Sequence, residues 1–332
     1  MEAVNAKKHI RVIGTGGTIA SAGASVLDFH QYNVSSTIQE ILSAVPEATE
    51  IAELSSSQPV NIDSYKIDNP SLVAIGRSAV EAATDDSVDG IVITHGTDTL
   101  EETAYFLHLV LPTDKPVVVV GAMRPSTGLS ADGPLNLYHA ILTASSSSAV
   151  GKGVLVVVNG QLYSARDVVK RDTASVGAID GGKYGIIGEI SGGNVCFSHA
   201  PVARHTLHSE FSQNRLTDLP TVDILFDHQG AGSHLYEASV TAGAQGIIVA
   251  GMGNGSLSPG ARSGAMLAHA AGIPFIRSSR TGQGIVAPLR SDQEYGIISA
   301  HSLPPHKARI LAMLAIAGGI SGSALQKVFS TY

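Results

Sequence analysis

Short apolar runs separated by polar, glycine-containing segments recur along the first half of this chain. Runs of this kind are typical of strands buried on both faces of a parallel sheet. The stretches between them carry apolar residues every three or four positions, which is the spacing of an amphipathic helix. This alternation predicts a mostly parallel sheet with right-handed crossovers. The predicted strands span 9–13, 90–94, 116–120 and 154–158, and the predicted helices span 36–45, 70–83, a segment beginning at 98, and 135–143.

The second half repeats the alternation on a smaller scale. From about 203 to 219 the chain is rich in His, Ser, Asn and Thr, and Pro220 follows. We interpret that stretch as a linker. The sequence therefore predicts a two-domain α/β protein with a larger N-terminal domain (1–202), a linker (203–219) and a smaller C-terminal domain (220–332). The strands predicted after the linker span 222–226, 246–250 and 274–277, and the helices span 260–271, 305–317 and a segment beginning at 323.

Composition favours an enzyme with a buried sheet. Hydrophobic residues make up 44% of the 332 positions and charged residues 15%, unlike a disordered or coiled-coil protein. A net charge of −7 without a basic cluster argues against a nucleic-acid partner. We expect no membrane partner, since no apolar run approaches spanning length and no leader precedes the first strand. The single Cys196 indicates a reducing compartment, so we expect the cytoplasm, or the periplasm if a leader was removed. The 13 His lack metal-ligand spacing, and we expect no metal.

Two polar turns follow predicted strands and are candidates for chemistry. Thr18 ends a glycine-rich turn after the first strand, and Thr97 and Asp98 follow the strand at 90–94. Ligands bind at the carboxyl ends of strands in open α/β sheets. Asp98 and Glu101 also have capping-box spacing, so these residues could serve only to start a helix. A dinucleotide-binding loop at the first turn is disfavoured, because the third glycine position is not a glycine.

Three further residues stand in segments of unusual composition. Tyr32 lies in a small, polar stretch (22–36) that suits a mobile lid, although it could be a surface aromatic. Lys170 lies in a charged segment that could be solvated or could supply a base. Asn254 lies in a glycine-rich loop after a predicted strand, where Asn often only caps a turn.

Taken together, these turns resemble the bacterial-type L-asparaginases and glutaminase-asparaginases. The matching stretches occur in the family's order across almost the whole chain, and jointly they are very specific. They are Gly-Thr-Gly-Gly-Thr18-Ile-Ala, Ile-Thr-His-Gly-Thr97-Asp98-Thr-Leu-Glu-Glu-Thr-Ala, Val-Gly-Ala-Met-Arg-Pro-Ser, Arg-Asp-Val-Val-Lys170 and Gly-Met-Gly-Asn254-Gly.

The resemblance implies hydrolysis of L-asparagine to L-aspartate and ammonia through an acyl-enzyme, without cofactor or metal. Thr18 would be the nucleophile, assisted by Tyr32, and Thr97, Asp98 and Lys170 would form a second, activating group. The family's homotetramers share active sites between subunits, so we expect the same here. A glutaminase-asparaginase of broader specificity and a non-catalytic amino-acid-binding protein remain alternatives. The residues expected to bind the substrate are Gly17, Asp63, Ser64, Tyr65, Gly96, Thr97, Asp98, Ala122 and Asn254.

The chain departs from the family pattern at three places. Tyr65 stands where many members carry Gln or Glu, and Asp63 replaces a frequent small residue. The acidic residue that a neighbouring subunit contributes in the family should fall near 287–292, where this chain has Ala-Pro-Leu-Arg290-Ser-Asp292. That segment offers no clear counterpart.

Overall fold

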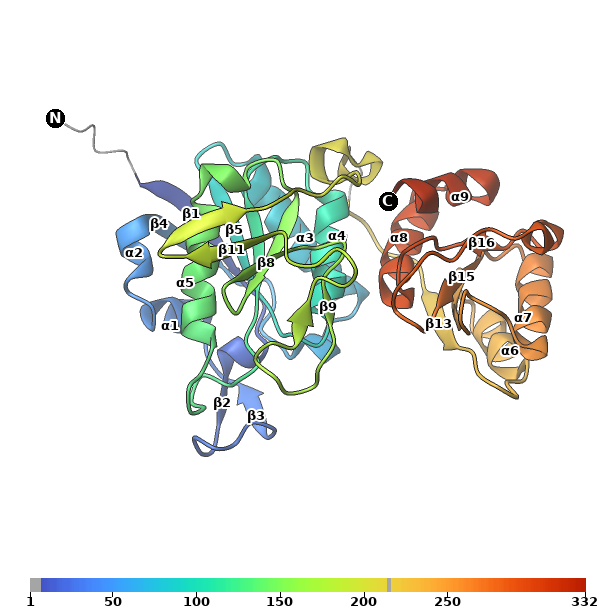
Figure 1. Cartoon of the computed structure of the whole chain (residues 1–332), viewed down its shortest axis with the longest axis horizontal. Coiled ribbons are helices and arrows are strands. Elements are labelled where there is room, and N and C mark those ends of the chain that lie inside the picture. Colours follow the sequence, from blue (N-terminus) through green and yellow to red (C-terminus); the bar gives the residue numbers. More distant parts are fainter. Residues whose placement is uncertain (1–6, 214–215) are drawn as a thin grey trace. The chain divides into compact units, whose positions relative to one another are not determined.

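The structure is a computed structural model that describes residues 7–213 and 216–332. It divides after Leu216 into two compact α/β units (Figure 1). Residues 1–6 and 214–215, which the predicted N-terminal domain and linker include, lie outside the described residues. The elements of the first unit are β1 (Lys8–Gly14), β2 (Ser21–Gly23), β3 (Tyr32–Val34), α1 (Ile38–Ser43), α2 (Ala48–Ile51), β4 (Ala52–Ser57), α3 (Asn69–Thr84), β5 (Gly90–Thr94), α4 (Leu100–Val110), β6 (Val117–Val120), α5 (Gly133–Ala144), β7 (Val154–Val158), β8 (Gln161–Ser164), β9 (Val169–Lys170), β10 (Ile179–Asp180), β11 (Gly188–Ser191) and β12 (Asn194–Phe197).

Within residues 7–213, eight strands form one sheet in the order β12-β11-β8-β7-β6-β5-β1-β4. Neighbouring strands in the series β7, β6, β5, β1 and β4 are parallel. Strands β8, β11 and β12 extend the sheet in antiparallel fashion. The predicted larger domain with a mostly parallel sheet is thereby confirmed. In register, Gly14 pairs with Thr94, Thr94 with Val120, and Val120 with Val157. The loops that follow β1, β5 and β6 therefore begin side by side at one edge of the sheet.

Helices cover both faces of this sheet (Figure 1). One face carries α1, α2 and α5, and the other carries α3 and α4. The core under α5 joins alternate strand residues such as Val92 and Val118 to Leu137 and Ile141, all without exposed surface. Burial of apolar side chains contributes about 25 cal/mol per Å² of apolar surface removed from water, so this core stabilises the sheet that positions the loops.

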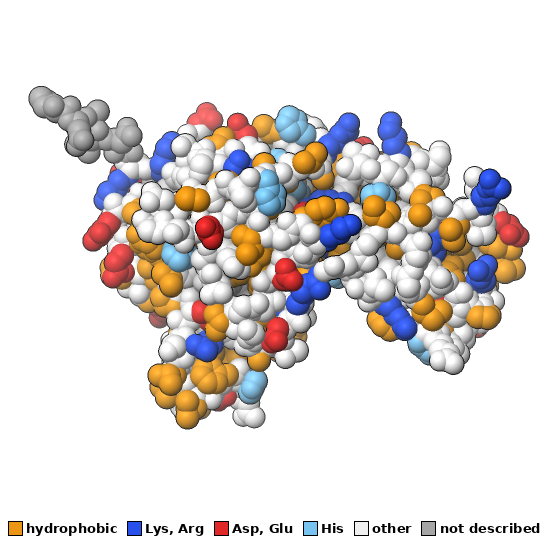
Figure 2. All heavy atoms as spheres, viewed as in Figure 1, with side chains coloured by type: hydrophobic (Ala, Val, Ile, Leu, Met, Phe, Trp, Pro, Cys, Tyr) orange, Lys and Arg blue, Asp and Glu red, His pale blue; other side chains and the backbone are white. Residues whose placement is uncertain are grey.

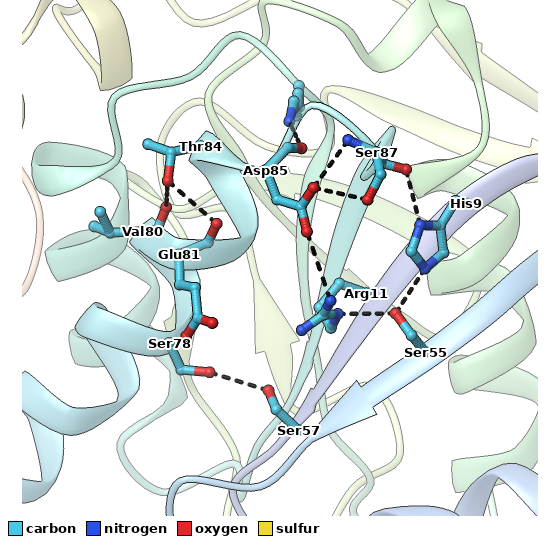
Figure 3. Close-up of polar contacts among 11 residues, drawn as sticks. His9, Arg11, Ser55, Ser57, Ser78, Val80, Glu81, Thr84, Asp85 and Ser87 are labelled. Carbon is cyan, nitrogen blue, oxygen red and sulfur yellow. Dashed lines mark hydrogen bonds and ion pairs between the residues drawn. The ribbon is translucent and has the colours of Figure 1, made fainter.

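The edge strand β4 was not predicted, because the stretch 55–61 is too polar for a buried strand. Among the described residues it pairs only with β1, and its polar side chains find polar partners (Figure 3). His9 Nε2 lies 2.7 Å from Ser55 Oγ, and Ser57 Oγ lies 3.0 Å from Ser78 Oγ. A strand at the edge of a sheet needs no apolar face when its neighbours satisfy its side chains.

The segment predicted as a linker contains local structure in its described part. Short 3₁₀ turns at Thr206–His208 and Glu210–Gln213 pack near α4. Phe211 is buried there, and Arg77 Nη2 donates a hydrogen bond to the carbonyl oxygen of Leu216 at 2.9 Å.

In the described part of the second unit, four parallel strands form a sheet in the order β13-β14-β15-β16. Tyr236, Val249, Ala265 and Phe275 belong to its core under α6 and α7. The prediction of a smaller α/β set is confirmed, although α6 and β16 were not predicted. No helix in the described parts of the chain is long and apolar enough to cross a membrane. The elements are β13 (Val222–Phe226), α6 (His234–Thr241), β14 (Gly246–Gly251), α7 (Pro259–Ala270), β15 (Phe275–Ser279), β16 (Ile298–Ser299), α8 (Pro305–Ala317) and α9 (Gly322–Thr331).

Candidate active site

The first predicted turn brings Thr18 to the sheet edge. The chain leaves β1 through Gly16 and Gly17, whose φ values of 96° and 79° favour glycine, and enters a 3₁₀ turn at Thr18–Ala20. Thr18 is 8% exposed, and its Oγ1 lies 3.1 Å from the hydroxyl of Tyr32. A partly accessible hydroxyl therefore has a second hydroxyl within hydrogen-bonding distance.

Tyr32 belongs to a β-hairpin and is half-buried. The stretch predicted as a lid forms strands β2 and β3, in which Gly23 pairs with Tyr32. The hairpin is attached to the loop after β6, since Ser126 N–H donates to Ser21 O at 2.8 Å and Gly23 N–H to Thr127 Oγ1 at 2.9 Å. Figure 2 shows hydrophobic side chains gathered over this hairpin, where Val26, Leu27 and Leu129 are 56%, 69% and 61% exposed.

The second predicted turn brings together three residues from distant parts of the sequence. Lys170 Nζ donates to Thr97 Oγ1 at 2.9 Å and contacts Asp98 Oδ1 at 2.6 Å. Thr97 is buried, whereas the Asp98 side chain is 57% exposed. A second hydroxyl thus faces an amine that a carboxylate holds in place.

The predicted capping box at Asp98 and Glu101 is wrong. The N-cap of α4 is Thr99, and no side chain caps the helix. The Asp98 carboxylate instead pairs with Lys170 Nζ, and Glu101 Oε2 accepts a hydrogen bond from the Lys170 main-chain N–H at 3.1 Å. Both carboxylates are engaged by Lys170, a partner that local spacing cannot reveal.

The two turns touch through their glycines. A Cβ built on Gly17 would lie 2.2 Å from the Cα of Gly96, and one built on Gly96 would lie 2.7 Å from Ser64 Oγ. A Cβ on Gly121 would meet the Thr97 methyl group at 3.0 Å. Gly121 begins the turn after β6 that contains Ala122, which we call the Ala122 turn. Ser64, Gly17, Gly96 and the start of this turn therefore converge around the two threonines.

Sequence analysis missed the side chains that hold the Ala122 turn. The Asp132 carboxylate accepts main-chain N–H groups from Met123 and Arg124, each at 2.9 Å. Asn136 donates to Gly121 O at 3.0 Å and accepts from the N–H of Asn159 at 2.9 Å. Their sequence context indicates only the start of a helix, so no local signal could have identified them.

His95 was also missed. It is fully buried, and Nδ1 lies 2.7 Å from Gly96 O. Because a carbonyl oxygen only accepts, Nδ1 carries the proton. Burial lowers the pKa of His95 to about 4, against the smaller opposing effect of that hydrogen bond. A neutral imidazole therefore lies within the turn before Thr97.

The other predicted substrate-binding residues are less enclosed. Asp63 forms an ion pair with Lys66 at 2.8 Å, and Tyr65 is 67% exposed. Asn254 lies in the second unit, in the loop after β14, and its role stays a prediction. Asp292 in that unit is buried and pairs with Arg277 Nη2 at 2.7 Å. Because it already has an internal partner, Asp292 is a poor substitute for the family's acidic residue.

The arrangement suits acyl transfer from an amide. It holds two threonine hydroxyls, each beside a group that can accept or relay a proton, and it surrounds them with glycine-rich turns whose N–H groups can face an oxyanion. Thr18, Thr97 and Asp98 lie in turns at the same edge of the sheet, where parallel sheets bind ligands, and short strands carry Tyr32 and Lys170.

Comparisons with known proteins point to one family over almost the whole chain. A family profile described as "Asparaginase, N-terminal" matches residues 9–203, and one described as "Glutaminase/Asparaginase C-terminal domain" matches residues 221–329. L-asparaginase 2 of Bacillus subtilis is 44% identical, over 98% of this chain and 86% of that protein. The glutaminase-asparaginase of Pseudomonas fluorescens biotype A is 42% identical, over 98% and 90%. The crystal structure of a probable cytoplasmic L-asparaginase from Campylobacter jejuni matches with a TM-score of 0.94 and 39% identity, over 98% and 100%.

Proposed function

Because this chain belongs to the asparaginase family, we propose that it hydrolyses L-asparagine with Thr18 as its nucleophile. It is an asparaginase, an amidohydrolase that releases ammonia from the side-chain amide. The observation that carries the proposal is the pair of hydroxyl contacts at one sheet edge: Thr18 with Tyr32 at 3.1 Å and Thr97 with Lys170 at 2.9 Å.

In the first step, Thr18 Oγ1 attacks the amide carbon and its proton passes to the Tyr32 oxygen, while the Tyr32 hydroxyl gives up its own proton toward the amide nitrogen. A threonine hydroxyl is a weak nucleophile at its own pKa and needs this assistance. The carbonyl oxygen becomes an oxyanion, which main-chain N–H groups near Thr97 and Ala122 stabilise. The C–N bond then breaks, the nitrogen gains a proton and leaves as ammonia, and an aspartyl ester remains on Thr18.

In the second step, water attacks the ester carbon and releases aspartate. Thr97 and the Lys170 amine relay the water proton toward the Thr18 oxygen, and Asp98 holds Lys170 Nζ in place. Thr18 regains its proton when the ester bond breaks. General acid–base assistance of this kind contributes about 10²–10⁴-fold.

Substrate binding involves the groups around the two threonines. Ser64 and Asp98 hold the α-carboxylate and the α-amine, and Gly17, Gly96 and Ala122 line the amide site. Asp63 and Tyr65 border it. Asn254 from a neighbouring subunit completes each site in a homotetramer. Support for that last assignment is the retained glycine-rich loop after β14, in which Met252 and Ser256 exchange main-chain hydrogen bonds of 3.0 and 2.7 Å.

A broader glutaminase-asparaginase is the second candidate, and the relative from Pseudomonas fluorescens favours it. If Tyr65 limits the depth of the pocket, the pocket accepts asparagine better than glutamine, whose side chain is one methylene longer. One methylene is worth about 1–3 kcal/mol, or roughly 10–200-fold in kcat/KM. Asparagine should be preferred within that range, and Tyr65→Gln should narrow the preference. An unchanged ratio would mean that Tyr65 does not shape the pocket.

Ammonia release from asparagine and glutamine, measured in parallel, tests the activity. Thr18→Ala should lose turnover and still bind aspartate. Acid quenching during turnover, followed by mass spectrometry of Thr18-containing peptides, should detect the aspartyl ester. Absence of ammonia from both substrates would favour a non-catalytic amino-acid-binding protein.

We also propose that the enzyme works in the cytoplasm. The Campylobacter jejuni relative is titled a probable cytoplasmic L-asparaginase, and Cys196 is an exposed free thiol, which suits a reducing compartment. Fractionation of cells that express the native gene tests this assignment.

A further inference from the structure

Lys170 lies on a strand that the main sheet does not hold. Strand β9 has two residues and pairs only with the equally short β10 within the described residues. The Lys170 head group must nevertheless stay 2.9 Å from Thr97 Oγ1. A lysine side chain has a flexible four-carbon stem, so the position of its main chain decides how often the amine reaches its target.

Glu101 supplies a link between that main chain and the catalytic turn. Its Oε2 accepts the Lys170 main-chain N–H at 3.1 Å. Glu101 lies in the first turn of α4, directly after the turn that carries Thr97 and Asp98. The helix is anchored by Leu100 and Ala104, which have no exposed surface. Hydrogen bonds with a charged partner are the stronger ones, at about 1.5–3 kcal/mol.

Both ends of Lys170 are thus bound to one continuous segment. Thr97 and Asp98 hold its Nζ, and Glu101 holds its main-chain nitrogen.

We propose that Glu101 is a positioning residue that sets the main chain of Lys170, and thereby keeps the Lys170 amine on Thr97. This inference rests on the proposed function, because it assigns the Thr97–Lys170 pair a role in turnover. In this role Glu101 acts through the Lys170 main chain and not by contact with the substrate.

Three variants test the proposal in the full-length enzyme. Glu101→Ala removes the acceptor and should lower kcat roughly 10- to 100-fold, with KM almost unchanged, because the lost interaction acts in the transition state. Glu101→Gln retains an acceptor oxygen and should recover most of the lost kcat. Glu81→Ala, on the exposed surface of α3, is the matched control and should leave kcat unchanged.

A double variant separates positioning from a general structural role. Lys170→Met removes the amine while keeping a stem of similar length. In that background, Glu101→Ala should leave the residual kcat unchanged, because no amine remains to be positioned. The melting temperatures of all variants report any loss of fold separately.

The outcomes separate a failure of the positioning role of Glu101 from a failure of the proposed function. If Lys170→Met lowers kcat severely but Glu101→Ala matches the wild type, the positioning role is wrong and the proposed function stands. The positioning role is also wrong if Glu101→Ala lowers kcat by the same factor with and without Lys170. If Lys170→Met keeps wild-type activity, both the pair's role and this inference fail.

Discussion

Gly17 and Gly96 pack main chain against main chain, with only 2.2 Å between a Cβ built on Gly17 and the Cα of Gly96. This contact joins the turns that carry Thr18 and Thr97, residues 79 positions apart in sequence by their numbers. No side chain fits between them. The distance between the two threonines is therefore set by glycine at both positions.

Gly96→Ala should lower both activity and stability. The new methyl group would lie 2.7 Å from Ser64 Oγ, so the turn or Ser64 must shift. Overpacking of this kind costs about 1–3 kcal/mol, and we expect KM to rise because Ser64 is proposed to hold the substrate. Urea unfolding and steady-state kinetics measure the two effects. Gly177→Ala is the control, since its methyl group would approach only Ser175 Oγ at 3.7 Å.

Thr97→Val should abolish most turnover without preventing aspartate binding. Valine keeps the shape of the side chain but removes the oxygen that Lys170 Nζ contacts at 2.9 Å. The expected loss in kcat is about 10²–10⁴-fold, which is the range for acid–base assistance. Calorimetric titration with aspartate measures binding, and ammonia release measures turnover. A near-normal kcat would remove Thr97 from the mechanism.

His95 should make the folded state less stable as the pH falls. The pKa of His95 is lowered from 6.5 to about 4 by burial, so between these values the unfolded chain binds a proton that the folded protein refuses. Stability from this residue is fully present above pH 6.5 and is lost progressively down to about pH 4. Over this pH range the free energy of unfolding should fall by about 3 kcal/mol, because each pKa unit of the shift is worth about 1.36 kcal/mol.

Unfolding free energies measured across this pH range check the prediction. His95→Asn removes the titrating group, so its stability should depend less steeply on pH than that of the wild type. His228→Asn, at an exposed position, should keep the wild-type slope. Parallel curves for the wild type and His95→Asn would show that His95 does not contribute.

Mixed oligomers should reveal whether sites are shared between subunits. Thr18→Ala subunits should be inactive, and Asn254→Ala subunits should be weakened. Refolded mixtures should regain activity, since some sites would combine an intact Thr18 with an intact Asn254 from another subunit. If the mixture has only the activity of the Asn254→Ala parent, diluted by its fraction, then Asn254 does not act across subunits.

The sequence by itself determined the main elements of both units. Buried parallel strands such as Val154–Val158 are apolar throughout because both faces are covered, and that local pattern predicted them correctly. The turns at Thr18 and Thr97 could be located for the same reason, since each follows such a strand. Resemblance to a family then supplied roles for them.

Only the tertiary structure decided which side chains meet. The edge strand β4 was missed because its polar residues are stabilised by partners on β1 and α3 rather than by an apolar face. Glu101 matched a capping pattern, yet its carboxylate binds the main chain of Lys170, a residue 69 positions away. Local spacing reports on periodicity within one element. Contacts between elements depend on sheet register and on how each loop packs, and those are fixed only when the whole chain has folded.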